Sequence, residues 1–179
     1  MKTRVVEIFT GKRFKVPECI QRIDHRFTHG WQLRYGGATK MFSDHTNDGS
    51  GAKAALELAT VELLRRIDKL PAPTGLQRSA NSNKTSDLPV GISGPIVRQR
   101  KSSAVRDCSL SVSLPRFGQT PRKSTIYIGN ENTFTQERYQ AALERAVQMR
   151  QQAEKAYQVA ATKAKRAEAR VLKAKVNLK

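Results

Sequence analysis

Residue types that commonly carry catalysis or bind metals are few in this chain. It has three histidines, His25, His29 and His45, and two cysteines, Cys19 and Cys108. Cys19, His25 and His29 could be drawn as zinc ligands, but such zinc sites use closely spaced cysteine pairs and a fourth ligand, and this segment offers neither. We therefore expect no metal site.

Motifs for enzymatic chemistry are also missing from the sequence. There is no glycine-rich phosphate loop, no nucleophile elbow and no metalloprotease motif. Gly36-Gly37 and the stretch from Asn47 to Gly51 have the composition of turns. A metal-dependent nuclease would need clustered acidic side chains, and these are sparse in the second half of the chain. We expect a protein that is not an enzyme and has no cofactor or small-molecule substrate.

The charge of the chain is the strongest functional signal. Lysine and arginine number 33 against 15 acidic residues, a formal net charge of +18 over 179 residues. Basic side chains exceed acidic ones in every part of the chain, so the excess does not belong to one disordered tail. A field of this sign attracts polyanions, and each neutralised phosphate releases a condensed counterion. The charge therefore predicts a nucleic-acid-binding protein.

The location of the protein follows from simpler features. Two cysteines far apart form no disulfide framework and favour a reducing compartment. The first residues lack the apolar run of a signal peptide, and no stretch is long and apolar enough to span a bilayer. We expect a cytoplasmic, nucleoid-associated protein without a membrane partner.

Composition divides the chain into two modules. Residues 71–89 are poor in apolar side chains and rich in proline, serine and asparagine, which predicts a flexible linker. A first module with an N-terminal hairpin then occupies residues 1–70, and a second occupies residues 90–150. Residues 151–179 form a basic C-terminal helix.

Strand and helix patterns recur in the same order in both modules. After the hairpin (5–9 and 14–16), strands are expected at 19–24, 30–36 and 40–43 and a helix at 52–69. In the second module, strands are expected at 91–100, 107–116 and 124–129, with a helix that begins near Thr135 as its N-cap. The Ala-Ala-Leu-Glu sequence near the start of each helix strengthens the match. The fold class we predict is α+β: two small modules, each a three-stranded antiparallel sheet packed on one helix, with a long C-terminal helix.

Alternation along the strands assigns the two faces of each sheet. Trp31, Leu33 and Tyr35 share one face, which must pack on the helix, while Gln32 and Arg34 share the other. The face opposite the helix is thus rich in arginine, glutamine, serine, threonine and tyrosine in both modules. A small sheet with such a face can enter the major groove of duplex DNA. The alternative is an ordinary half-solvated sheet.

Four short stretches of the first module carry a resemblance to a known family. They are Arg22-Ile23-Asp24, Gly30-Trp31-Gln32-Leu33-Arg34, Lys40-Met41-Phe42-Ser43-Asp44 and Ala54-Ala55-Leu56-Glu57-Leu58-Ala59. Together, over about residues 20–69, they resemble the Apetala-2/ethylene-response-factor type DNA-binding domain in its bacterial, phage and homing-endonuclease versions. The resemblance implies a three-stranded sheet on one helix that reads the major groove. The second module keeps the element order but lacks the Gly-Trp-x-x-Arg strand.

Candidate DNA-contacting residues come from two sources. The resemblance implies Arg22, Arg26, Gln32, Arg34 and Lys40 in the first module. Strand alternation nominates Arg98, Arg100, Arg116, Arg122, Lys123 and Tyr127 in the second. Trp31 lies at the DNA in some members of that family, but alternation favours the core here.

The end of the chain predicts one long helix. From Thr135 to about Lys175 there is neither glycine nor proline, and alanines recur at spacings of three and four. Three interpretations stay open: a homodimerisation helix, a basic arm along phosphates, or a solvated basic helix.

The whole sequence favours a sequence-specific double-stranded DNA-binding protein, a transcriptional regulator of bacterial, phage or mobile-element origin. An RNA-binding or ribosome-associated factor and an architectural or recombination accessory protein are the alternatives.

Overall fold

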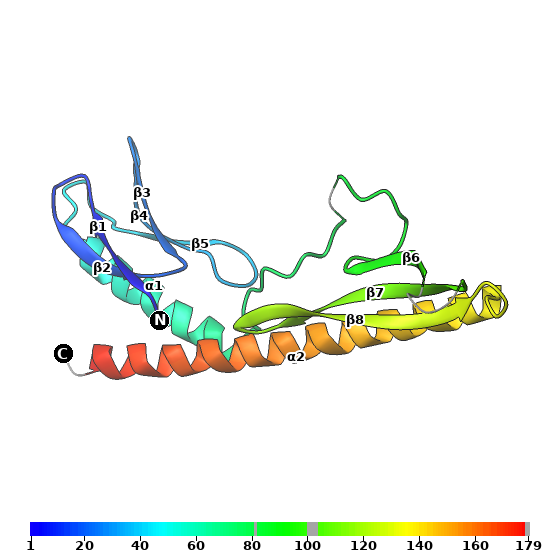
Figure 1. The fold of residues 1–179 in the computed structure, drawn as a ribbon. Coiled ribbons are helices and arrows are strands. Elements are labelled where there is room, and N and C mark those ends of the chain that lie inside the picture. Colours follow the sequence, from blue (N-terminus) through cyan, green and yellow to red (C-terminus); the bar gives the residue numbers. More distant parts are fainter. Residues whose placement is uncertain (81, 100–103, 178–179) are drawn as a thin grey trace. The chain divides into compact units, whose positions relative to one another are not determined.

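The structure is a computed structural model and describes residues 1–80, 82–99 and 104–177, with side chains up to residue 174. It is α+β, with three small antiparallel sheets and two helices, one of them the long helix at the end of the chain (Figure 1). The chain forms two compact units. Met1–Pro73 and Ala161–Lys179 make the first unit, and Thr74–Ala160 make the second.

The first unit contains a two-stranded hairpin, a three-stranded sheet and a helix. The hairpin is β1 (Thr3–Glu7) with β2 (Arg13–Pro17), the sheet has the order β3 (Ile20–His25), β4 (Thr28–Leu33), β5 (Lys40–Ser43), and the helix is α1 (Ala52–Lys69). The predicted helix bounds are confirmed. The strand predicted at 30–36 ends earlier in the structure, at Leu33, because Gly36 and Gly37 adopt left-handed backbone conformations and turn the chain.

The core of the first unit has the composition that strand alternation predicted. Trp31, Leu33 and Tyr35 are buried against the apolar face of α1, and the Trp31 indole N–H donates to the Ala52 carbonyl at 2.7 Å. The expected position of Trp31 in the core is confirmed. The hairpin also packs against this core: Phe14 of β2 lies edge-to-face on the Trp31 ring, with ring centroids 5.9 Å apart.

The end of the long helix α2 (Gln136–Asn177) also belongs to the first unit. Ala169 is buried in the same core, Lys165 forms an ion pair with Glu18, and Arg166 donates to the Asp68 carbonyl at 2.9 Å. An alanine of the predicted long helix therefore packs in the core of the first unit, an arrangement that the sequence analysis did not consider.

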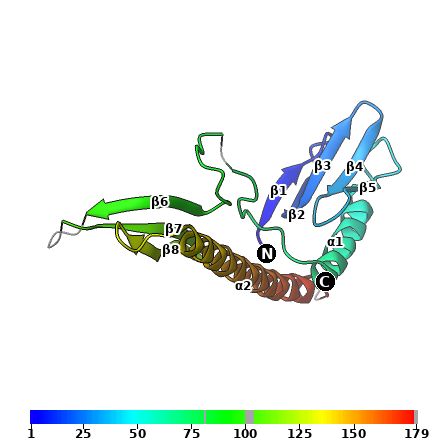
Figure 2. The same ribbon diagram turned by 90° about the vertical axis from the view of Figure 1, so that its right-hand side faces the viewer.

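The second unit is a three-stranded antiparallel sheet packed on the first part of α2 (Figure 2). Its strands are β6 (Ile92–Gln99), β7 (Arg106–Arg116) and β8 (Gln119–Asn130), in that order. Leu110, Val112, Ile126 and Ala146 lie in its core. The strand order and the start of the helix just after Thr135 are as predicted, and the described residues between α1 and β6 form no helix or strand.

Candidate nucleic-acid interface

The face of the first sheet that points away from α1 is defined by strand register, and we refer to it as the first outer face. Gln21 lies opposite Gln32, and Gln32 opposite Met41, so these three side chains share a face. Arg34 joins them, since its Nε donates to Gln32 Oε1 at 2.6 Å. The first outer face consists of Gln21, Ile23, His25, Thr28, Gln32, Arg34, Met41 and Ser43.

The contact between Gln32 and Arg34 holds two polar side chains side by side. It uses one guanidinium nitrogen and the amide oxygen. The terminal guanidinium nitrogens of Arg34 and the amide nitrogen of Gln32 have no protein partner in the described part of the chain. Arg34 therefore presents a fixed fork of N–H donors to whatever approaches this face, which is the geometry that binds guanine O6 and N7.

Arg22 has a different place from the one that the family resemblance implied. Its strand register is opposite Trp31, on the side of the sheet that packs on α1, and its guanidinium lies 5.0 Å from the centre of the Trp31 ring. It makes two bonds to Asp44, at 2.9 and 2.6 Å, and one to Asp24. Burial by itself would lower the pKa of Arg22, but the bonds to Asp44 and Asp24 outweigh it and the pKa is raised. We assign Arg22 a structural role.

Lys40 and Arg26 lie at the margins of the first sheet. Lys40 is exposed on the edge strand, in register with Leu33 and therefore on the helix side, with its ammonium 5.1 Å from the Phe42 ring centre. Arg26 lies in the turn between β3 and β4, and its guanidinium lies 5.1 Å from the ring centre of its neighbour Phe27. Neither side chain is on the first outer face itself.

The face of the second sheet that points away from α2, here the second outer face, is rich in hydroxyl groups. Ser111 pairs with Ser93 on one side and with Thr125 on the other, and Tyr127 pairs with Ser109. Arg98 is on this side too, because it lies opposite Asp107, which precedes the core residue Cys108. The second outer face consists of Ser93, Ile96, Arg98, Asp107, Ser109, Ser111, Ser113, Lys123, Thr125, Tyr127 and Asn130.

Two other predicted residues of the second module lie near the turn between β7 and β8. Arg116 donates from Nε to the Thr120 carbonyl at 3.0 Å. Arg122 is exposed but lies opposite Leu114, which packs on the second core, so its register places it on the helix side. Arg100 lies outside the described residues.

With the exception of Arg22, the candidate residues that the structure describes take no part in its ion pairs. Hydrogen bonds from Arg65 and Arg66 hold the pKa of Glu62 at about 2. In the described residues, the partners of the carboxylates are the Met1 ammonium, His29, Arg13, Arg22, Arg65, Arg66, Arg106, Arg150 and Lys165. Within the described residues, no carboxylate forms an ion pair with Arg26, Arg34, Lys40, Arg98, Arg116, Arg122 or Lys123. Of the ten candidate residues that the structure describes, only Arg22 forms ion pairs with acidic side chains.

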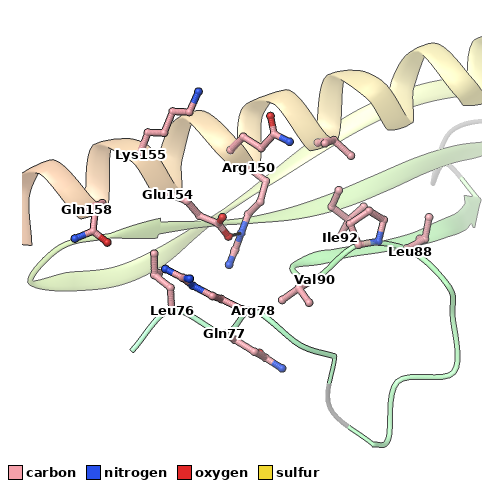
Figure 3. Close-up of a pocket in the computed structure, with 13 residues that line it drawn as sticks. Leu76, Gln77, Arg78, Leu88, Val90, Ile92, Arg150, Glu154, Lys155 and Gln158 are labelled. Atoms are coloured by element: carbon pink, nitrogen blue, oxygen red, sulfur yellow. Dashed lines mark hydrogen bonds and ion pairs between the residues drawn. The ribbon is translucent and has the colours of Figure 1, made fainter. Parts of the chain in front are cut away.

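A cavity of about 690 Å³ lies in the second unit between α2 and the segment that leads into β6 (Figure 3). Leu88 and Ile92 form part of its apolar lining, and Arg78 lines it as well. Arg150, also in the lining, bonds Glu154 at 2.6 Å and the Ser113 carbonyl. Two protein partners therefore hold the Arg150 side chain in place.

The described residues contain neither a membrane-spanning helix nor a metal site. No described helix is long and apolar enough to cross a bilayer. The described histidine, cysteine and acidic side chains form no group of three or more that could hold a metal ion.

Sequence reasoning missed two features of this region. One is the burial of Arg22. Arg22 lies opposite Trp31, so the alternation of buried and exposed side chains in β4, applied also to β3, would have indicated that Arg22 faces the helix. The other is the exposure of the Phe27 side chain, which the residue types of the turn did not indicate.

Comparison with known proteins adds nothing to the geometry: no family model, no curated protein and no solved structure matches this chain.

Proposed function

We propose that this chain is a sequence-specific double-stranded DNA-binding protein, a transcriptional regulator of bacterial, phage or mobile-element origin. The observation that carries the proposal is the distribution of ion pairs. Acidic side chains pair with arginines and lysines away from the outer faces, whereas Arg34, Arg98 and Lys123 have no described carboxylate partner. Cations left unpaired beside polar side chains suit a polyanion that carries hydrogen-bonding groups.

The width of the first outer face supports the major groove as the binding site. Three strands with neighbours about 4.8 Å apart span roughly 10 Å from β3 to β5. The major groove of B-form DNA is about 12 Å wide and admits a small β-structure. In this arrangement Arg34 and Gln32 are the residues that contact base edges, and Lys40 and Arg26 at the margins contact phosphates or neighbouring bases.

The second outer face is suited to holding the duplex in register. Serine, threonine and tyrosine hydroxyls, with Lys123 and Arg98, are typical phosphate-contacting groups. Two units on one chain raise each other's effective concentration at a DNA site, so two weak contacts can give tight binding. A homodimer through the exposed side of α2 would add inverted symmetry to the site.

The proposal is tested by selection from a pool of random duplexes at physiological salt, with structured RNA and single-stranded DNA as competitors. We expect an enriched motif that RNA does not displace. Strong salt-dependent binding without any enriched motif would instead indicate an architectural protein, and preferential binding of RNA would indicate a ribosome-associated or other RNA-binding factor.

Replacement of Arg34 gives a sharper test, with a matched control. Arg34→Ala should weaken binding about 10-fold or more at particular base pairs and relax the motif there. Arg65→Ala removes the same charge from the outer side of α1, where Arg65 pairs with Glu62, and should change affinity little and leave the motif intact. Equal effects of the two replacements on every sequence would contradict base reading by the first outer face.

A further inference from the structure

The turn between β3 and β4 exposes an aromatic ring, that of Phe27, which takes no part in the core of the first unit. Phe27 is 80% exposed, the most exposed of the large hydrophobic side chains in the described residues. Figure 1 shows this turn at the tip of the projecting β3–β4 hairpin. An apolar ring held in water is unfavourable, and no other apolar side chain stacks on it within the described ring contacts.

The residue before Phe27 places its side chain against the ring. The Arg26 guanidinium lies 5.1 Å from the centre of the Phe27 ring, a cation–π contact. A guanidinium near a ring still has N–H groups available at its edges, so Arg26 keeps hydrogen-bonding capacity for a ligand. No carboxylate pairs with it in the described residues.

The charge around the tip favours a nucleic acid as the ligand over an apolar protein surface. His25 and Thr28 close the hairpin, and neither is acidic. Asp24, the nearest acidic residue in sequence, lies on the helix side of the sheet, where it bonds Arg22 and His29 at 2.9 Å. The tip therefore presents one ring and one unpaired cation to its surroundings.

We propose that Arg26 and Phe27 together read a guanine and a neighbouring thymine in the major groove of the DNA site, an inference that rests on the proposed function. Thymine displays a C5-methyl group in that groove, and phenylalanine is one of the side chains that contacts it. Guanine presents O6 and N7 there, the two acceptors that an arginine fork binds. Phe27 and Arg26 are thus specificity determinants for one dinucleotide step.

The position of this step follows from the length of the hairpin. Phe27 is five residues before Gln32, which is roughly 17 Å of extended chain. At about 3.4 Å of helix axis per base pair, this length of chain reaches at most about five base pairs. The guanine–thymine step should lie within this distance of the bases read by Gln32 and Arg34.

Chemically modified duplexes of the selected sequence test the proposal by fluorescence anisotropy. Replacing the contacted thymine by deoxyuridine removes only its methyl group, and should weaken binding of the unmodified protein about fourfold. Replacing the guanine by 7-deazaguanine removes the N7 acceptor, and should weaken binding about tenfold. With Phe27→Ala the uracil duplex should bind as well as the thymine duplex, and with Arg26→Ala the two guanine forms should bind equally.

Two further variants separate a direct contact from a general loss of affinity. Leu58→Ala removes an apolar side chain that is 61% exposed on α1, away from the hairpin tip, and should retain the full difference between thymine and uracil. Phe27→Leu keeps an apolar contact and should retain part of it. Far-ultraviolet circular dichroism establishes that each variant is folded.

The results that overturn the inference differ from those that overturn the proposed function. If no duplex motif is enriched, both fail. If a motif is enriched but replacing each thymine in turn by deoxyuridine changes nothing, only the inference fails. It fails equally if Phe27→Ala still distinguishes thymine from uracil as the unmodified protein does.

Discussion

The buried pair of Arg22 and Asp44 allows a quantitative test of the first unit. Asp44→Ala removes the carboxylate that accepts two bonds from the Arg22 guanidinium, at 2.9 and 2.6 Å. The two side chains are 5% and 0% exposed, so water cannot replace the lost partner at this position. Removing one member of a buried pair costs about 3–5 kcal/mol, because the other charge is left buried. Asp24 remains bonded to Arg22 but is partly exposed, and we therefore expect a loss at the lower end, about 3 kcal/mol.

Equilibrium unfolding in urea measures this loss. The chain has a single tryptophan, Trp31, which is buried in the core of the first unit, so its fluorescence reports that unit. With a urea dependence of about 1.5 kcal/mol per molar, the unfolding midpoint should fall by about 2 M. The double variant Arg22→Met with Asp44→Leu removes both charges and should recover most of the stability, because an apolar pair replaces a buried ion pair at little net cost.

Two outcomes would refute this reasoning. A midpoint change below about 0.3 M for Asp44→Ala would mean that the buried charge is not held by this pair. A double variant that folds as stably as the unmodified protein but loses its preferred DNA sequence would make Arg22 a DNA contact rather than a structural residue.

Two further predictions concern the stability of the first unit. Hydrogen bonds from Arg65 and Arg66 hold the pKa of Glu62 at about 2, below its ordinary 4.5, so the stability it contributes is present above pH 4.5 and is lost as the pH falls toward 2. Melting temperatures recorded across that range should fall less steeply for Glu62→Gln, and identical slopes would contradict the assignment. Ala169→Leu should lower the unfolding free energy by about 1–3 kcal/mol, since Ala169 is buried in the first core and a larger side chain overpacks it. Ala167→Leu, at an exposed position of the same helix, should be nearly neutral in the same urea titration, and equal effects of the two would show that α2 does not pack there.

Local patterns predicted most of the elements. The bounds of α1 follow from the spacing of its apolar residues and from Pro71 beyond its end, and the burial of Trp31 and Leu33 follows from strand alternation. These properties depend on neighbours within a few residues in the sequence.

The features of the fold and of the candidate site that the sequence did not predict depend on contacts between distant parts of the chain. Periodicity indicates that a helix has a face of small residues, but not which surface covers it, so the burial of Ala169 in the first core could not be read from the alanine spacing. In the same way, the family resemblance implied Arg22 as a DNA contact, whereas its pairing with Asp44, 22 residues away, is decided by which side of the sheet it faces. Phe27 is notable only because nothing covers it, which is a property of the folded unit.

The participation of α2 in both cores has a consequence for synthesis of the protein. Ala142 and Ala146 of this helix lie in the second core, and Ala169 of the same helix lies in the first. The first 73 residues therefore leave the ribosome well before the residue that completes their core. At about 5–20 residues per second, the first unit waits roughly 5–20 s for Ala169 to be made. A nascent or truncated chain that ends before Ala169 lacks a buried side chain of the first core, so the first unit reaches its full stability only after translation has passed this part of α2.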